Sequence, residues 1–368
     1  MISELFSQPL FVFLLVILTG YTVLVIGLIW YIRKLKAPLK NDALKPFVTP
    51  PAQPNPIQTE PSKNRFIDKA DEATRLNQTF QKFVPKQFVD HFAKHGSSTL
   101  ELGRADEDDV AILFCDIRGF TSLSERMTPQ ELMRFLNSYF LRMNDPIHQN
   151  GGFIDKFIGD AIMALFDHPQ GSNEDKARDA IKAAIDLHAA LKMYNQHRQN
   201  SNYPPINVGI GVHFGPVIIG TVGSDDRMDT TVIGDSVNIA YRLEGLAPLF
   251  NADIVVSAQA LDTAKANGHF SYRLLEWVKV KGRENAVEIY EILDHLPAKE
   301  RDQKLLIADD IKHGLALRKR YALQDALDVF TAAHEKAPND ALVLHHIEQC
   351  RIMLTKPTPK TKDGALRM

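Results

Sequence analysis

The sequence predicts an α+β fold in which helices cover a single β-sheet, and three observations support this prediction. Apolar runs of strand length alternate with longer amphipathic segments between residues 109 and 293. Glycine, proline and aspartate turn signals separate several of these runs. The 368 residues are 45% hydrophobic and 24% charged, which excludes wholesale disorder and is enough for two or three domains with ordinary cores.

The pattern predicts its elements in a definite order: a strand at 110–117, a helix at 128–147, strands at 153–157 and 161–166, a helix at 173–197, strands at 206–214 and 217–222, a helix at 236–246, and strands at 253–257, 271–277 and 287–293. Thr128-Pro129-Gln130-Glu131 is a capping box with proline at the first helical position. Gly159-Asp160 is a hairpin signal, and Gly215-Pro216 predicts a turn between two strands.

Charge and cysteine content exclude two classes of protein. Lys and Arg number 43 against 45 Asp and Glu, so no basic excess favours a nucleic-acid partner. The two cysteines, Cys115 and Cys350, lie far apart and match no zinc or redox spacing. A disulfide scaffold is therefore excluded, a reducing compartment is favoured, and Cys115 is expected to pack in the core.

Residues 10–32 form an uncharged apolar stretch that is long enough for a transmembrane helix across a core of about 30 Å. Trp30 and Tyr31 end it like an aromatic belt, and basic residues follow but do not precede it. A cleaved signal peptide, the alternative, would need a basic start and a small-residue cleavage site. We expect a single-pass protein of the inner or plasma membrane, with residues 1–9 outside and the rest cytoplasmic.

Two segments connect this helix to the α+β domain. Residues 33–63 are rich in proline and predict a semi-extended tether. Residues 64–106 predict a helical linker, in which an approximate heptad spacing fits a short coiled coil: Phe66, Ala70, Ala73, Phe80 and Phe83. A helix packed on its own domain is the alternative.

The C-terminal part predicts an all-α segment at 300–354 and a disordered tail at 355–368. The spacing of five residues resembles one tetratricopeptide repeat: Gly314, Ala326, Phe330, Ala333 and Pro338. A simple helical cap is the alternative. Because one such unit cannot bury its faces alone, we expect it to pack on the preceding domain or on a protein partner.

Two aspartates are candidates for a metal-binding site. Asp116 ends an apolar strand, and Asp160 lies at the predicted hairpin turn. A carboxylate at the end of a buried strand needs a cation, a helix N-terminus or a metal as partner. Two such carboxylates on neighbouring strand ends are able to hold hard divalent cations. Taken singly, each aspartate would fit an ordinary turn equally well.

Three motifs in order give these aspartates a context: DIRGFTSLSE at 116–125, DKFIGDAIMA at 155–164 and TTVIGDSVNIAYRLE at 230–244. Their order and spacing resemble the class III adenylyl/guanylyl cyclase catalytic domain over about half the chain. FVPKQF at 83–88 resembles the segment that precedes many microbial members. The resemblance implies a ferredoxin-like α+β sandwich at 107–295.

The resemblance also implies a metal site. Asp116 and Asp160, with the backbone carbonyl of Ile117, correspond to the ligands of two Mg²⁺ or Mn²⁺ ions in each active site. In such a site one ion lowers the pKa of the ribose 3′-hydroxyl, and the other stabilises the leaving pyrophosphate.

Lys156 and Thr231 occupy the positions that contact the base in this family. A lysine donates to the N1 acceptor of adenine, whereas guanylyl cyclases typically carry glutamate there. Many adenylyl cyclases have aspartate where this chain has Thr231, so this chain resembles a Lys/Thr subclass. Selectivity for ATP is therefore expected to depend mainly on Lys156.

Asn238 and Arg242 stand four residues apart on a predicted helix and so share a face. The resemblance implies that Asn238 orients the ribose and that Arg242 neutralises charge developing on the phosphates, a role that suits a planar guanidinium. Lys281 and Arg227 resemble residues that bind the terminal phosphates.

In this family the two halves of the site come from different subunits. Lys156, Thr231, Asn238 and Arg242 belong to one face, and the two metal-binding aspartates to the partner's face. The chain carries both halves, which implies a symmetric homodimer with shared sites. The resemblance thus predicts an adenylate cyclase that converts ATP to 3′,5′-cyclic AMP and pyrophosphate. The alternatives are a catalytically silent nucleotide-binding regulatory module and a guanylate cyclase.

Overall fold

The computed structural model describes residues 105–168, 171–224, 226–264, 270–279 and 286–355, together with residues 71, 72, 74–76, 79, 85, 88, 102, 103, 366 and 367. The predicted membrane segment 10–32, the tether 33–63 and most of the linker 64–106 lie outside these residues. Among the helices that the structure does describe, none combines the length and the apolar character that a bilayer span requires.

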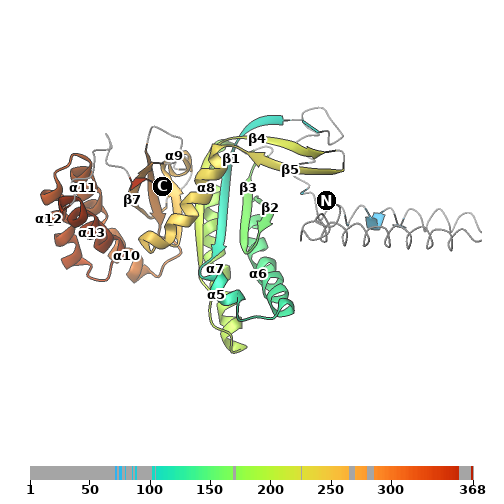
Figure 1. The fold of residues 1–368 in the computed structure, drawn as a ribbon, viewed down its shortest axis with the longest axis horizontal. Helices are drawn as coiled ribbons and strands as arrows, with labels where there is room; N and C mark the ends of the chain where they lie inside the picture. The colour runs from blue at the N-terminus through green and yellow to red at the C-terminus, as the bar shows by residue number, and fades with distance from the viewer. Residues whose placement is uncertain are drawn as a thin grey trace, which may run out of the picture. The chain divides into compact units, whose positions relative to one another are not determined.

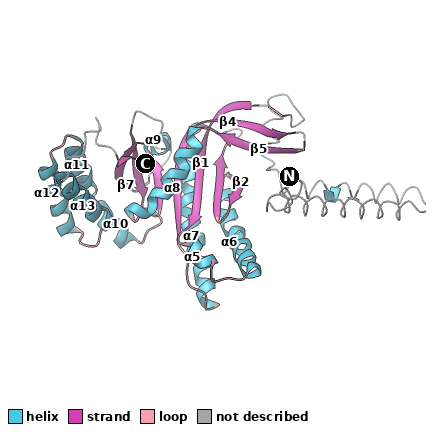
Figure 2. Ribbon diagram, in the orientation of Figure 1, coloured by secondary structure: helices cyan, strands magenta, loops and turns pink. Residues whose placement is uncertain are grey.

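The strands form one mixed sheet, drawn in magenta in Figure 2. Their bounds are β1 Ala105–Ile117, β2 Phe153–Ile158, β3 Ala161–Phe166, β4 Val208–Ser224, β5 Arg227–Ile233, β6 Ile254–Ser257, β7 Tyr272–Lys279, β8 Val287–Ile292 and β9 Leu366–Arg367. The strand order is β2-β3-β1-β4-β6-β8-β7-β9, and β5 pairs with β4 beside this path. The α+β prediction is confirmed.

The helices lie on both sides of this sheet and beyond its β7 end (Figure 1). Their bounds are α5 Phe120–Ser124, α6 Pro129–Gln149, α7 Asn173–Asn200, α8 Asp235–Leu246, the 3₁₀ helix Ala247–Phe250, α9 Ala258–Ala264, α10 Ala298–Leu306, α11 Ala308–Lys319, α12 Leu323–Lys336 and α13 Ala341–Thr355.

From Val110 to Cys115 strand β1 is fully buried, which explains the continuous apolar sequence of this part. Successive side chains alternate between the faces, so Leu113 and Cys115 join the core under α6 and α7, whereas Ile112 and Phe114 join the core that includes Ala240 of α8. Cys115 is fully buried, as expected. Strand β1 therefore lies between two layers of helices.

The predicted capping box begins α6. The Thr128 side chain accepts a hydrogen bond from the Glu131 backbone N–H at 3.3 Å, and the Glu131 carboxylate accepts one from the Thr128 N–H at 2.8 Å. Ser172 and Asp175 form the same box at the start of α7. Both helices therefore start where the sequence signals place them.

The turn predicted at Gly215-Pro216 is wrong, because 206–214 and 217–222 are parts of one long strand, β4. At Pro216 only β1 pairs with this strand, since β6 pairs with 210–212 and β5 with 218–224. A proline is tolerated where one side of a strand has no ladder to complete. The true turn joins β4 to β5, a strand that the sequence pattern did not predict.

The C-terminal helices α11, α12 and α13 pack on the β7 end of the sheet. Their apolar residues share one core with Leu275 and Trp277 of β7. Gly314 of α11 lies against the Phe330 ring of α12, where an added Cβ would be 2.6 Å from the ring. The expected packing of this segment on the preceding domain is thus observed, with a small residue at a helix contact.

Buried ion pairs join these helices to the sheet. Arg273 of β7 donates to Glu291 of β8 at 2.7 Å and to Asp340, just before α13, at 2.5 Å. Arg318 of α11 pairs with Glu276 of β7. All five side chains are at most 5% exposed, so each charge depends on its partner. Within the tail 355–368, β9 pairs in parallel with β7.

Candidate active site

Asp116 and Asp160 lie together at the end of β1. Antiparallel pairing sets Cys115 opposite Ile162 and so brings the β2–β3 turn beside the last residues of β1. Gly159 adopts a left-handed φ of 66° in this turn, a conformation that glycine adopts without strain. Asp160 hydrogen-bonds Asp116 and also accepts a bond from the Ile117 N–H at 3.3 Å.

The two carboxylates create a concentration of negative charge. Burial, together with the hydrogen bond and charge of Asp116, raises the pKa of Asp160 to about 7. Asp116 Oδ1 is buried without a hydrogen-bond partner among the described residues. Carboxylate oxygens held this close and left unsatisfied are the donor set that hard divalent cations prefer. The chemistry of Asp116 and Asp160 therefore fits divalent metal ions.

Glu244 of α8 adds a third acidic group that the sequence analysis missed. Burial, and then the charges of Asp116 and Asp160, raise the pKa of Glu244 to about 7, while Arg118 opposes this shift. Glu244 closes the last motif, 230–244, but its role there depends on the packing of α8 against β1. Sequence spacing alone does not reveal that contact.

Lys156 and Thr231, the two residues expected to contact the base, contact each other. Lys156 of β2 donates from Nζ to Thr231 Oγ1 of β5 at 2.8 Å, although 75 residues separate them in the sequence. The contact exists because the β4–β5 hairpin brings Thr231 to β2. A lysine and a hydroxyl placed together offer one donor and one adaptable group to a purine edge.

Asp155, beside Lys156, is a further residue that sequence reasoning missed. Its side chain is 0% exposed and lies 3.6 Å from Lys156 Nζ. Neither carboxylate oxygen has a hydrogen-bond partner among the described residues, and burial raises the pKa of Asp155 to about 6. The acidic residue next to Lys156 in DKFIGD was the only signal in the sequence. Asp155 thus places a carboxylate beside the Lys156 ammonium group.

Asn238 and Arg242 lie on the outer side of α8, four residues apart as predicted. Neither makes a hydrogen bond or an ion pair within the described part of the chain. The helix sits close to the sheet because Gly211 of β4 has no side chain. An added Cβ there would lie 2.5 Å from the Ala240 carbonyl oxygen and 2.3 Å from the Glu244 nitrogen.

Of the two expected phosphate-binding residues, the structure describes only Arg227. Arg227 begins β5 at the exposed tip of the β4–β5 hairpin. Lys281 lies outside the described residues. The structure thus brings together the aspartates in one group and Lys156 with Thr231 in another, while Asn238 and Arg242 face outward on α8.

Fold and site together define a nucleotide cyclase domain. The chain belongs to the family of adenylate and guanylate cyclase catalytic domains, whose family model matches residues 103–294. Among its relatives, an adenylate cyclase of Anabaena cylindrica is 45% identical over 219 residues, which are 58% of this chain and 42% of the relative.

Two further similarities agree with this family. The terminal-differentiation-specific adenylate cyclase of Dictyostelium discoideum is 36% identical over 276 residues, 75% of this chain and 13% of the relative. A solved bacterial light-regulated adenylyl cyclase is 26% identical, with a TM-score of 0.55 over 68% of this chain and 71% of that structure. The chain spans less than half the length of these two curated relatives.

Proposed function

We propose that this protein is an adenylate cyclase that converts ATP to 3′,5′-cyclic AMP and pyrophosphate. The observation that carries the proposal is the pair of carboxylates, Asp116 and Asp160, with an unsatisfied buried oxygen at the end of β1. The 45% identity to an adenylate cyclase supports ATP as the substrate. The reaction needs the ribose 3′-oxygen to attack the α-phosphorus while pyrophosphate leaves.

Divalent cations fit the carboxylate pair, and we propose two Mg²⁺ or Mn²⁺ ions in each site. Asp116, Asp160 and the Ile117 carbonyl would hold them. Bound there, the ions would supply charge neutralisation and a more acidic 3′-hydroxyl. The protein's own contribution is to keep the two carboxylates side by side, although burial and then the neighbouring Asp116 raise the pKa of Asp160.

The remaining residues would bind and orient the nucleotide. Lys156 would donate to adenine N1, and the Thr231 hydroxyl would contact the amino group, each giving up its bond to the other. Asn238 would orient the ribose, and Arg242 would stabilise charge on the phosphates. Arg227 is a candidate for the terminal phosphates, as is Lys281, which lies outside the described residues.

We further propose that the active site forms between two copies of this chain. The elements that carry the nucleotide-binding residues also expose large apolar side chains, which a subunit interface would bury. These side chains, each about half exposed, are Phe157 and Ile158 on β2, Met228 and Ile233 on β5, and Tyr241 on α8. A symmetric homodimer would cover them and bring the aspartates of one subunit to the nucleotide held by the other.

The proposed layout of the whole chain follows the sequence. Residues 10–32 would anchor it in the inner or plasma membrane, with 1–9 outside and the cyclase domain, 107–295, in the cytoplasm. Residues 33–63 and 64–106 would be tether and helical linker. The segment 300–354 would act as a tetratricopeptide-like unit that offers a surface to a protein partner, followed by the tail 355–368.

Activity measurements test the reaction. Asp116→Ala should lower cyclic AMP formation from ATP with Mn²⁺ by at least about 100-fold, because one metal ligand is lost. Glu107→Ala, an exposed residue of the same strand, is the matched control and should change little. Equal output from wild type and Asp116→Ala would leave a silent nucleotide-binding module as the better description.

Mixing two inactive variants tests whether the active site lies between two subunits. Asp116→Ala and Arg242→Ala chains are each expected to be inactive alone. A heterodimer of the two contains one site with neither substitution, so activity should return to a fraction of the wild-type rate on mixing. If verified heterodimers of folded chains stay inactive, the site does not lie between subunits.

A further inference from the structure

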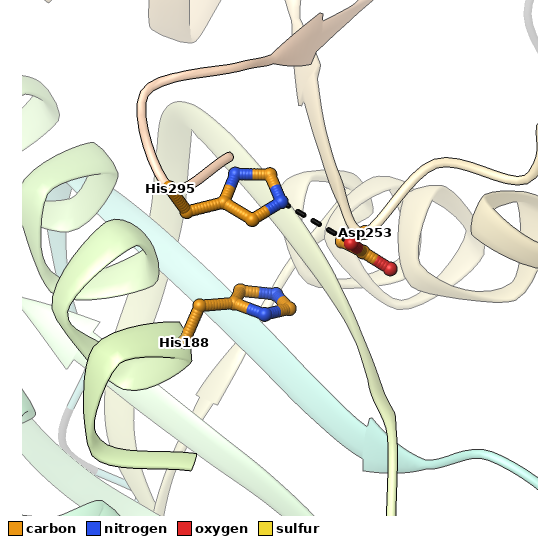
Figure 3. A group of neighbouring side chains, drawn as sticks. All are labelled: His188, Asp253 and His295. Atoms are coloured by element: carbon orange, nitrogen blue, oxygen red, sulfur yellow. Dashed lines mark hydrogen bonds and ion pairs between the residues drawn. The ribbon is translucent and has the colours of Figure 1, made fainter. Parts of the chain in front are cut away.

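A second group of metal-capable side chains lies away from the carboxylate pair. His188 comes from α7, Asp253 from the segment before β6, and His295 from the turn after β8 (Figure 3). One ligand atom from each lies within 4.8 Å of the others. The fold thus collects two imidazoles and a carboxylate from three distant parts of the sequence.

The three side chains already approach the geometry of a coordination site. His295 Nε2 donates to Asp253 Oδ2 at 3.2 Å, and the two imidazole rings lie 4.5 Å apart, with the carboxylate beyond one end of both, as Figure 3 shows. Three ligands of a tetrahedral zinc ion, with bonds of about 2.0–2.2 Å, are separated by about 3.3–3.5 Å. Small side-chain rotations would therefore bring all three ligand atoms into range.

His188 has a nitrogen left for a ligand. Its Nε2 is buried without a hydrogen-bond partner among the described residues. A neutral imidazole carries one lone pair, which lies on Nε2 when the ring proton is on Nδ1. A metal-binding histidine offers such a lone pair to the ion.

A purely structural role leaves part of this arrangement unexplained. Buried polar atoms are normally satisfied, yet His188 Nε2 and His295 Nδ1 both lack partners in the described part of the chain. In the other such group, Glu276 with His345 and His346, the arginine contacts a histidine as well as the carboxylate: Arg318 pairs with Glu276 and contacts His346 Nδ1. A cation therefore already occupies one of the imidazole nitrogens of that second group.

We propose that His188, Asp253 and His295 bind a divalent transition-metal ion of the zinc class. Two imidazole nitrogens and one carboxylate oxygen form a ligand set that such ions favour over Mg²⁺, which prefers oxygen ligands. Asp253 is 35% exposed, which leaves solvent access for a water as the fourth ligand. To bind the ion through Nε2, His295 would carry its ring proton on Nδ1 instead of sharing it with Asp253.

The site is connected to the active-site strand through Arg118. This residue donates to the Ala252 carbonyl, and its Nη2 lies 3.3 Å from Asp253 Oδ1. Arg118 thus holds one oxygen of Asp253 and leaves the other toward the histidines. Because Arg118 follows Asp116 by two residues, an ion at this site would fix the backbone next to the proposed catalytic carboxylates.

Cobalt titration of the full chain tests the proposal. Co²⁺ replaces zinc in such sites, and low-coordinate Co²⁺ absorbs strongly in the visible range. The metal-stripped protein is titrated in excess Mg²⁺, which occupies the carboxylate pair. We expect a visible band that saturates at one equivalent per chain at micromolar Co²⁺ and disappears on adding Zn²⁺. His188→Gln and His295→Gln should abolish it.

His197→Gln is the matched control, because His197 is an exposed residue of the same helix α7. It should bind Co²⁺ like the wild type. Asp253→Asn, which preserves side-chain size, is the second variant if a histidine substitution prevents folding, as judged by circular dichroism. Equal titrations of wild type and folded ligand variants, or binding only at millimolar metal, would overturn the proposal. The readout is independent of cyclase activity.

Discussion

The close approach of α8 to β4 makes Gly211 a sensitive position. An alanine Cβ at Gly211 would lie 2.3 Å from the Glu244 nitrogen and 2.5 Å from the Ala240 oxygen, both backbone atoms of α8. Backbone atoms do not rotate away as a flexible side chain does, so the helix itself must shift. Overpacking of this kind costs about 1–3 kcal/mol.

We therefore expect Gly211→Ala to lower the free energy of unfolding by about 1–3 kcal/mol, and the melting temperature by about 2–4 °C per kcal/mol. The rate of cyclic AMP formation should also fall, even at temperatures where the variant is still folded. The displaced helix carries Asn238 and Arg242, and a misplacement of about 1 Å is able to cost on the order of 100-fold in rate. Thermal melts and cyclic AMP assays well below the melting temperature separate the two effects.

Gly245 provides the matched control on the same helix. No atom lies within 4 Å of a Cβ placed there, so Gly245→Ala meets no obstacle. Because alanine favours a helix over glycine, this variant should be more stable by about 0.5–1 kcal/mol and fully active. A Gly211→Ala protein that melts and turns over like the wild type would show that α8 does not press on β4 as described.

Three further predictions concern other parts of the molecule. Lys156→Glu with Thr231→Cys should raise the rate with GTP relative to ATP, since guanine N1 carries a proton and needs an acceptor; an unchanged ratio contradicts the assigned base-reading roles. Gly314→Ala should destabilise the chain although alanine favours helices, because the added Cβ would clash with the Phe330 ring. Phe330→Leu should relieve this clash, so a double-mutant cycle measured by thermal melts should give a coupling energy of at least about 0.5 kcal/mol. Thr128→Ala should cost about 1 kcal/mol through loss of the α6 cap, and a melt indistinguishable from wild type would contradict this.

Local signals predicted most of the secondary structure. The Thr128 capping box, the Gly159-Asp160 hairpin and the apolar strand at 110–117 all agree with the structure, because each depends on residues that are near neighbours in sequence. Gly215-Pro216 misled the prediction, since a turn signal within a long strand is overridden when the flanking residues pair continuously with β1. That pairing is a long-range property.

The residues of the candidate site were likewise predictable in part, where the signal was local. Motif spacing identified Asp116, Asp160 and Lys156, and the resemblance gave them roles that remain predictions to be tested. The contact between Lys156 and Thr231, the buried Asp155 and the cluster around His188 were not predictable from spacing. Each depends on how strands and helices far apart in the sequence meet, which no single segment encodes.

The buried ion pairs beneath the C-terminal helices have a consequence for the domain's independence. Arg273 and Glu276 extend from β7 into an interface that Asp340 and Arg318 complete from the helical side. Removing residues 300–368 would leave Glu276 without Arg318, and Arg273 with Glu291 as its remaining partner, on an uncovered apolar surface. The strands at the β7 end of the sheet and the C-terminal helices share one apolar core, so separating the two parts would expose that core to water.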